Sequence, residues 1–482
     1  AYEIYQCDWS SDVCSSDLMS EILSIAEAAR RIQSKALSPV ALAEQCLERI
    51  KTYDAKLNAF LLVTEKEALA QARQAEKDIA AGRSKGPLHG IPIAHKDIYS
   101  TKGIRTTAHS KILADHVPNE DATTVRKLAE AGTVMLGKLA THEFAMGGPS
   151  FDLPWPPARN PWNYDHVTGG SSSGTGAAIA AGMTLGGTGS DTGGSIRNPS
   201  AWCGVSGIKP TYGLCSRAGV FPLSYSLDHT GPMAWTVEDC ALQLQAMAGH
   251  DTRDPASASV PIPDYHSLLR TDLKGVRVGL IRHFHERDTK IDPEMQKSLD
   301  AALVVLRDLG ATVTDVRLPP LSQFVACCYI ILLTEAFVVH STEFRTRFND
   351  YCENFRDRAA LAALLSGPDY LQAQRLRRQL TDEVRAATTN VDVLVTAALP
   401  GPAPTFAASN KWAMFKQPPL PMPCNVTGQP VTTICTGFHS SGLPLAIQVI
   451  GHPFQDATSL AVAHAYQVAT PWRGKRPVLK AA

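Results

Sequence analysis

Residues 169–197 constrain the fold of this chain more than any other stretch. They read GGSSSGTGAAIAAGMTLGGTGSDTGGSIR, a run of small and hydroxyl residues without an aromatic side chain. The Ala-rich residues 177–181 predict a short buried helix between two Gly-Gly-Ser clusters. Glycines at both ends predict tight turns in which backbone N–H groups approach a ligand closely. A serine after Gly-Gly in such a turn is a candidate nucleophile with oxyanion-binding amides beside it.

A flexible Gly/Ser linker is the alternative interpretation of this stretch. Linkers seldom enclose an apolar run such as AAIAAG, and this one continues into SIRNPSAWCGVSGIKP. The pattern therefore favours an ordered, functional segment.

Composition narrows the class of protein. The chain has 482 residues, 44% of them hydrophobic, and its 46 Lys and Arg residues equal its 46 Asp and Glu residues. These values are typical of a soluble globular protein with a large core. Balanced charge gives no sign of a nucleic-acid or membrane surface. Thr334 and Glu335 interrupt the longest apolar run, residues 324–339, so we expect no membrane span.

The cysteines and histidines indicate neither a disulfide framework nor a metal site. Eleven cysteines occur without a CxxC pair, which favours reduced thiols and a cytoplasmic location. The fifteen histidines form no HExxH motif, so neither a metal nor another cofactor is expected.

The first residues differ from the rest of the chain. Residues 1–18 lack the basic start and apolar core of a signal peptide, and a helical pattern begins directly after Met19. We interpret residues 1–18 as a non-native leader and residues 19–482 as a single domain. Within it we expect an N-terminal helical region, residues 24–82, and a variable, substrate-shaping region, residues 251–417.

Alternating helix and strand patterns favour an α/β fold. A buried strand through Ile91 and Ile93 is expected to deliver Lys96 and Asp97 to its end, and Gly137-Lys138 is expected to form a turn. Helices are expected from Ser24, over residues 38–53, 64–81 and 121–131, from Val237, and over residues 293–309 and 457–467. Further strands are expected over residues 133–136, 276–281, 311–316, 391–396 and 443–451.

Three groups stand out together: Lys96, the serine cluster at residues 171–173, and Ser195. Their arrangement resembles the amidase signature family. The matching segments are GIPIAHKD, GGSSSGTGAAIAAG, GSDTGGSIRNPS, GIKPTYG, SLDHTGPMAWTVED and PLAIQVIGHPFQDATSLAVAHAYQ. The resemblance spans residues 24–467 and is weakest over residues 251–417. It implies a large mixed β-sheet covered by helices on both faces.

The resemblance also implies roles for individual residues. The lysine of the GIPxxxKD motif is Lys96, the first serine of GGSS is Ser171, and the serine of the second GGS is Ser195. These would be the base, a proton bridge preceded by a cis peptide bond, and the nucleophile. Ser173 replaces the glycine of the more common GGSSGG, so Ser172 and Ser173 stay open as alternatives for the bridge.

Elementary chemistry agrees with this assignment. A serine hydroxyl needs a base, and a free lysine has a pKa near about 10.4, which burial lowers by about 3–5 units. The oxyanion would bind the backbone amides of Thr192, Gly193, Gly194 and Ser195. Asp191 and Arg197 would hold the turn in shape. Substrate-binding residues are expected at Met146, Gly147 and Gly170.

The function that follows is hydrolysis of C–N bonds in small-molecule amides, with aryl amides and carbamates (urethanes) as further substrates. The glutaminase subunit of a tRNA-dependent amidotransferase is the main alternative, and EFAMGGPSFDLPWPPARNPWN lacks the more polar loop expected there. A non-catalytic scaffold of the same fold is the third candidate function. No nucleic-acid or membrane partner is expected, and the N-terminal helices are a candidate homodimer interface.

Overall fold

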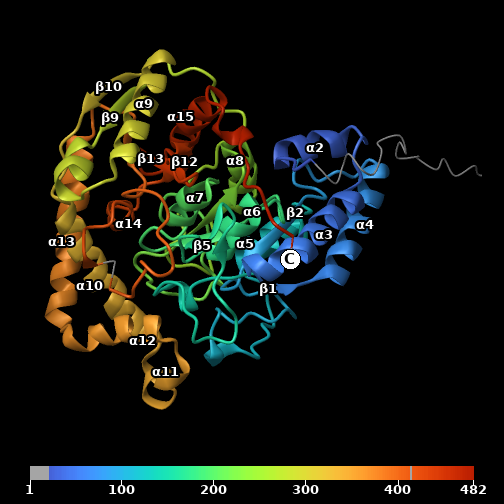
Figure 1. Cartoon of the computed structure of the whole chain (residues 1–482), viewed down its shortest axis with the longest axis horizontal. Helices are drawn as coiled ribbons and strands as arrows, with labels where there is room; N and C mark the ends of the chain where they lie inside the picture. The colour runs from blue at the N-terminus through green and yellow to red at the C-terminus, as the bar shows by residue number, and fades with distance from the viewer. Residues whose placement is uncertain (1–20, 413–414, 482) are drawn as a thin grey trace, which may run out of the picture.

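The computed structural model describes residues 21–412 and 415–481, so the expected leader lies outside the described residues. Its centre is a sheet of eleven strands, in the order β1-β3-β2-β6-β8-β7-β12-β13-β11-β9-β10 (Figure 1). Those strands are β1 (Phe60–Val63), β2 (Pro92–Lys96), β3 (Val134–Leu139), β6 (Gly186–Asp191), β7 (Ser206–Lys209), β8 (His229–Ala234), β9 (Arg277–Leu280), β10 (Thr312–Asp315), β11 (Val393–Ala397), β12 (Val431–Phe438) and β13 (Pro444–Gly451). A two-stranded sheet joins β4 (Arg159–Asn160) and β5 (Asn163–Val167).

Strand directions in the large sheet are mixed. β2 runs parallel to both β3 and β6, whereas β6 pairs with β8 in antiparallel fashion. β12 is antiparallel to both of its neighbours, and β9 is parallel to β10 and β11. The α/β class with a large mixed sheet, expected from the sequence, is confirmed.

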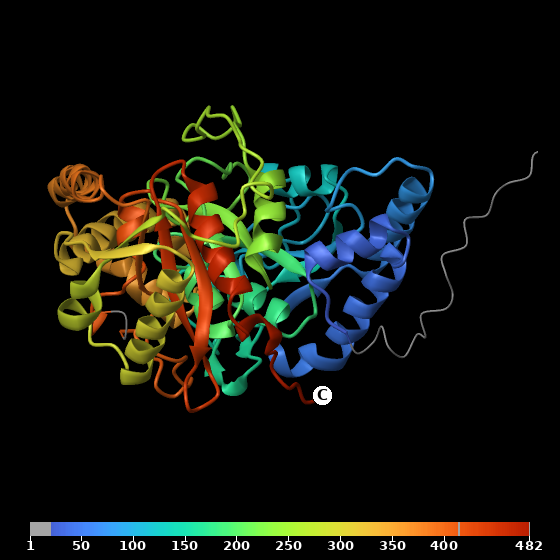
Figure 2. The ribbon, with the colours of Figure 1, turned by 90° about the horizontal axis from the view of Figure 1, so that it is seen from above.

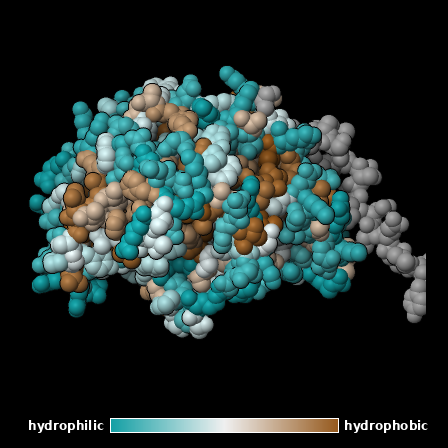
Figure 3. Space-filling view, turned by 90° about the horizontal axis from the view of Figure 1, so that it is seen from below, coloured by the Kyte–Doolittle hydropathy of each residue, from teal (hydrophilic) through white to brown (hydrophobic). Residues whose placement is uncertain are grey.

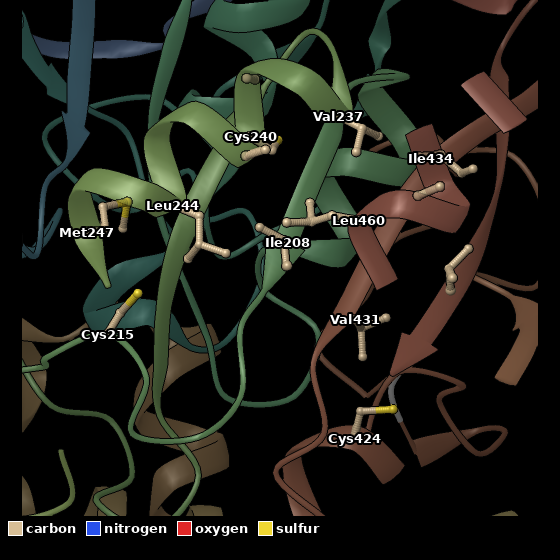
Figure 4. Packing of buried hydrophobic residues seen from close by; sticks show 14 of the residues in the cluster. Ile208, Cys215, Val237, Cys240, Leu244, Met247, Cys424, Val431, Ile434 and Leu460 are labelled. Atoms are coloured by element: carbon tan, nitrogen blue, oxygen red, sulfur yellow. The ribbon is translucent and has the colours of Figure 1, made fainter. Parts of the chain in front are cut away.

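Helices cover both faces of this sheet. Successive strand residues point to opposite faces, and β7 shows it: a side chain at Gly207 would meet Ser200 of α7, whereas Ile208 packs toward α8 (Figure 4). The longer helices are α2 (Ile25–Gln33), α3 (Pro39–Leu57), α4 (Glu65–Ala80), α5 (Thr123–Glu130), α6 (Ser173–Ala180), α7 (Arg197–Cys203), α8 (Val237–Met247), α9 (Pro293–Asp308), α10 (Leu321–Val339), α12 (Glu353–Ala360), α13 (Gly367–Ala387) and α15 (Asp456–Val468). The short helices α11 (Ser341–Thr346) and α14 (Pro423–Val426) complete the set named here.

The core on the α8 face is built from several elements. Figure 4 shows Ile208 of β7 among Val237, Cys240 and Leu244 of α8, with Leu460 of α15 beside them. All five side chains are completely buried. Burial of an aliphatic side chain contributes about 1.5–3 kcal/mol, so this packing holds β7 against α8.

The N-terminal region is helical except for one strand. Ser24 and Ser38 cap α2 and α3 as expected, and the Ser24 hydroxyl accepts a hydrogen bond from the Glu27 amide at 3.1 Å. Between α3 and α4, however, the chain forms β1, which pairs with β3 at the sheet edge.

The expected turn at Gly137-Lys138 is wrong, because β3 continues through both residues. Gly137 has a φ of 152°, and a Cβ there would lie 2.1 Å from the Leu62 carbonyl oxygen. The glycine is needed for the close approach of β1, which the local sequence does not reveal. Lys138 is fully buried, and its ammonium group donates to the Thr106 hydroxyl at 2.8 Å.

Residues 251–417 are continuous with the rest of the fold. Their strands β9, β10 and β11 form one end of the large sheet, and α10, α12 and α13 pack together beside it (Figures 1 and 2). The limits of the substrate-shaping region, and the single-domain division itself, remain predictions.

Helix α10 is long and apolar enough, by length and composition, to cross a membrane, and it alone meets that test among the described residues. It packs against α13 and α14, and its Glu335 accepts a hydrogen bond from the Ser224 hydroxyl at 2.5 Å. The carboxylate that interrupts the apolar run is therefore tied into the protein. On the face of the molecule that Figure 3 shows, apolar residues lie in separate areas between hydrophilic ones.

Candidate active site

Lys96 ends β2 within the large sheet, where every residue of the strand is buried. Its Nζ lies 2.7 Å from Ser171 Oγ, 2.9 Å from Ser190 Oγ and 3.1 Å from Ser172 Oγ. Three hydroxyls and no carboxylate of the described chain thus surround the amine at hydrogen-bond distance. Burial lowers the pKa of Lys96 to about 7, although the charges of Asp191 and Asp228 oppose the shift.

The serine cluster stands at the start of α6, and two of its three hydroxyls, those of Ser171 and Ser172, contact Lys96. The Gly170–Ser171 peptide bond is cis, as the family resemblance implies. Ser171 reaches both Lys96 and the large cavity described below. The Ser173 hydroxyl instead donates to the Ala140 carbonyl at 3.3 Å. The extra serine therefore faces away from Lys96, which leaves Ser171 and Ser172 as its neighbours.

The turn between β6 and α7 is organised by the Asp191 carboxylate. It accepts hydrogen bonds from the Gly194 amide at 2.8 Å and the Ile196 amide at 3.0 Å. It also pairs with the Arg197 guanidinium at 2.8 Å, and both side chains are completely buried. Burial alone would raise the pKa of Asp191, but Arg197 lowers it well below its usual range. The shape-holding role predicted for Asp191 and Arg197 agrees with these contacts.

One of the four predicted oxyanion donors, the Gly194 amide, already makes a hydrogen bond within the protein. Because the Gly194 amide donates to Asp191, it is not available to a ligand in this arrangement. Within residues 21–412 and 415–481, no partner is found for the amides of Thr192, Gly193 and Ser195. Gly194 instead has a φ of 125°, a backbone conformation that favours glycine. This conformation lets the turn expose the amides of the neighbouring residues.

A cavity of about 490 Å³ opens over this turn. Ser171, Ser195 and Gly193 line it, and so do Met146 and Gly147, two of the residues expected to bind substrate. Gly170, the third, also lines the cavity. Ser195 is half-buried, and its hydroxyl makes no hydrogen bond to another side chain or carbonyl of the described chain. The cavity thus brings together the residues that the sequence placed 24 positions apart.

The remaining cavity wall is mostly apolar and carries one cation. Leu223, Leu332 and Met422 line it, and the guanidinium of Arg358 is the one Lys or Arg side chain among the lining residues that the structure describes. Arg358 is buried and donates to the Lys411 carbonyl at 2.7 Å, and no carboxylate pairs with it in the described part of the chain. Burial lowers the pKa of Arg358 to about 10.

His142 is the other ionisable group of note in the cavity. Burial, and then the neighbouring Lys96, lowers the pKa of His142 to about 3, so its ring is neutral at physiological pH. No Asp or Glu lines the cavity among the described residues, and no group of three or more His, Cys, Asp or Glu side chains there could hold a metal ion.

Sequence reasoning missed two residues of this site. Ser190 contacts Lys96, and its only sequence signal is its place in the GSDTGGS segment. Arg358 comes from α12, which lies in the region where the resemblance is weakest, so nothing local marks it. Both reach the site through tertiary packing.

Comparison with known proteins places the chain in a family. The model of the family described as Amidase matches residues 41–460. The chain belongs to the amidase family. A glutamyl-tRNA(Gln) amidotransferase subunit of Geobacter metallireducens is 41% identical to it, over 94% of this chain and 98% of the relative.

Solved structures with the same fold include one of a member of the amidase signature family. A chain of a vestigial protein complex, described as revealing the origins of an s-triazine catabolic enzyme, matches with a TM-score of 0.87 and 32% identity, covering 95% of this chain and 100% of that one. A bacterial aryl acylamidase of the amidase signature family matches with a TM-score of 0.85 and 25% identity, covering 95% of this chain and 99% of that one.

Proposed function

We propose that this amidase family member is a serine hydrolase that cleaves C–N bonds of amides, with aryl amides and carbamates among its substrates. Ser195 is the nucleophile, Ser171 the proton bridge and Lys96 the base. The observation that carries the proposal is the 2.7 Å contact between Lys96 Nζ and Ser171 Oγ, at the wall of the cavity that Ser195 also lines.

Acylation begins with Lys96 in its neutral form, which the lowered pKa makes accessible near neutral pH. Lys96 takes the proton of Ser171 as Ser171 takes that of Ser195, and Ser195 Oγ attacks the amide carbon. The free amides of Thr192, Gly193 and Ser195 receive the developing oxyanion; each donor of this kind is worth about 3–4 kcal/mol.

The tetrahedral intermediate collapses when the C–N bond breaks and Ser171 returns a proton to the leaving nitrogen, drawing on Lys96. Water then adds to the ester carbon, its proton passes to the same relay, and the bond to Ser195 Oγ breaks as that oxygen is reprotonated. A carbamate follows the same steps, because its carbonyl carbon also bears a nitrogen leaving group.

The charges of the cavity favour an amide without a positive group. Arg358 offers a cation with no carboxylate partner, and no acidic side chain lines the cavity among the described residues. A substrate with a neutral body fits the apolar wall, and an anionic or strongly polar end fits Arg358. Free glutamine carries an ammonium group, for which this cavity offers no carboxylate.

The second candidate is the glutaminase subunit of an amidotransferase, favoured by the name of the Geobacter relative at 41% identity. It uses the same three side chains and requires a partner subunit. Ammonia release from glutamine that appears only when the chain is co-purified with a partner would establish it. Activity of the isolated chain on simple amides favours the hydrolase.

A substrate panel tests the leading proposal. Purified protein is assayed with a 4-nitroanilide, a primary amide, an ester and an aryl carbamate, beside Ser195→Ala as the matched control. Turnover of the anilide or carbamate that Ser195→Ala loses by about 10³-fold or more is the expected result. Equal rates in the two proteins would remove Ser195 from the mechanism.

A non-catalytic scaffold is separated from an enzyme by covalent labelling. A fluorophosphonate probe should modify Ser195 in the wild-type chain and leave Ser195→Ala unmodified.

The cytoplasmic location and the homodimer through α2, α3 and α4 remain predictions. Sedimentation of the purified chain measures the oligomeric state directly.

A further inference from the structure

A second cavity, of about 320 Å³, reaches Ser190, whose hydroxyl contacts Lys96. Ala145, Thr192 and Leu223 line both this cavity and the large one, so they form the wall between them. At one end lie exposed residues, including Tyr225, which is 59% exposed. At the other lies Ser190, which is 5% exposed and in contact with Lys96 Nζ at 2.9 Å. The cavity therefore connects solvent-exposed side chains with the proton relay.

Hydrogen-bonding side chains line this second cavity, and they include the donors Arg217 and Arg253 beside His229, Asp228 and Ser190. His229 Nδ1 lies 2.6 Å from the Leu227 carbonyl oxygen, so the ring carries its proton on Nδ1 and presents Nε2 as an acceptor. That Nε2 is buried and has no partner among the described residues. Asp228 adds a carboxylate, and Ser190 adds a hydroxyl. Water, which both donates and accepts hydrogen bonds, suits a lining that holds donors and acceptors together.

The wall itself is held by Asp228. Its carboxylate accepts from the Thr192 hydroxyl at 2.6 Å and from the Leu223 amide at 2.8 Å. Thr192 is also the first of the predicted oxyanion donors, and it lines the large cavity. The wall between the two cavities therefore includes Thr192, at the turn where the acyl group would be attached.

We propose that the second cavity delivers the water that hydrolyses the acyl-enzyme; the inference rests on the proposed function. After acylation the acyl group fills the large cavity near Ser195, which hinders water from that side. Water entering past Ser190 adds its oxygen to the ester carbon and gives its proton to the Ser171–Lys96 relay. The ester bond to Ser195 Oγ then breaks, and that oxygen takes the proton.

Narrowing the second cavity away from the reacting groups tests this route. Val220 is half-buried, lines that cavity and does not line the large one. With 4-nitrophenyl acetate in a stopped-flow instrument, the burst of nitrophenol measures acylation and the later steady rate measures deacylation. We expect Val220→Phe to keep the burst rate and to slow deacylation about tenfold or more. Val338→Phe is the control, because Val338 is 63% exposed on α10 and lines neither cavity.

A reversible block keeps the test decisive if Val220→Phe fails to fold. Val220→Cys is treated with benzyl methanethiosulfonate and then with dithiothreitol, beside wild-type protein treated in the same way. Deacylation should fall on labelling and recover on reduction, while the burst rate stays constant. Hydroxylamine, offered as a second small acceptor, should show the same loss in hydroxamate formation.

The outcomes separate the two proposals. A normal burst with unchanged deacylation in the blocked proteins would overturn the water route and leave the hydrolase intact. An equal fall in the burst rate and the steady rate would also overturn it, because the change would then reach the acylation machinery. Hydrolysis of 4-nitrophenyl acetate that does not depend on Ser195 would contradict the proposed function itself.

Discussion

Lys96 Nζ and Ser171 Oγ lie 2.7 Å apart inside the protein, although 75 residues separate them in the chain. Lys96 is fully buried, and Ser171 is 1% exposed. A lysine that is buried without a carboxylate at hydrogen-bond distance favours its neutral form, so this pair is suited to accept a proton rather than to bind an anion.

The pH dependence of turnover should report this lysine. Its pKa is lowered to about 7, so the neutral, competent fraction grows as the pH rises through that value and disappears below it. We expect kcat/KM for a neutral anilide to rise with pH and level off above an apparent pKa near about 7. Lys96→Arg should be inactive throughout, because a guanidinium stays protonated. A profile that is flat between about pH 5 and 9 would contradict the assignment.

Ser173→Gly should change turnover little. The Ser173 hydroxyl donates to Ala140 and does not contact Lys96. We expect kcat/KM within about twofold of wild type, a free-energy change of less than about 0.5 kcal/mol. Ser171→Gly, measured beside it, should lose about 10²-fold or more of the activity. Similar losses in the two variants would reassign the proton bridge.

Gly194→Ala should damage the oxyanion turn. Gly194 has a φ of 125°, and a Cβ there would lie 2.7 Å from Asn198 Oδ1. Moving the turn displaces the amides of Gly193 and Ser195, so we expect kcat to fall about 10²–10³-fold with a smaller change in KM. Gly367→Ala is the control, because a Cβ at Gly367 meets nothing within 4 Å. Wild-type kcat in Gly194→Ala would show that the turn is not used.

Arg358→Met should remove the preference for an anionic substrate end. The guanidinium lines the cavity without a carboxylate partner among the described residues. Comparing succinyl and acetyl 4-nitroanilides, we expect kcat/KM for the succinyl compound to fall about 10–100-fold, and that for the acetyl compound to change little. If both substrates lose activity equally, Arg358 supports the cavity wall rather than selecting substrate.

Asp191→Asn should destabilise the protein. Asp191 and Arg197 are both completely buried, and the substitution leaves the Arg197 charge without its partner. Losing one member of a buried pair costs about 3–5 kcal/mol of the free energy of unfolding. Urea denaturation followed by circular dichroism measures the change, with the exposed Asp382→Asn, whose partner is Arg385, as the control. An effect as small as that control would contradict the structural role.

Several helices, and the strands β2, β3, β9, β10, β11 and β13, could be predicted because local patterns specify them, whereas β6, β7, β8, β12 and the helices α10 and α13 were not expected. The capping serines at Ser24 and Ser38 and the buried residues 391–396 needed no information from elsewhere in the chain. The wrong turn at Gly137-Lys138 shows the limit: that glycine serves the close approach of β1, a contact between distant segments. For the same reason β1 itself was not expected.

The sequence by itself identified Lys96, Ser171 and Ser195 as candidate site residues, because each lies in a short motif that can be read from the order of residues alone. Tertiary structure alone decided the rest. It turned Ser173 toward Ala140, committed the Gly194 amide to Asp191, and brought Ser190 and Arg358 to the site. Hydrogen bonds and cavity walls depend on which atoms meet after packing, and the order of residues along a chain does not specify those distances.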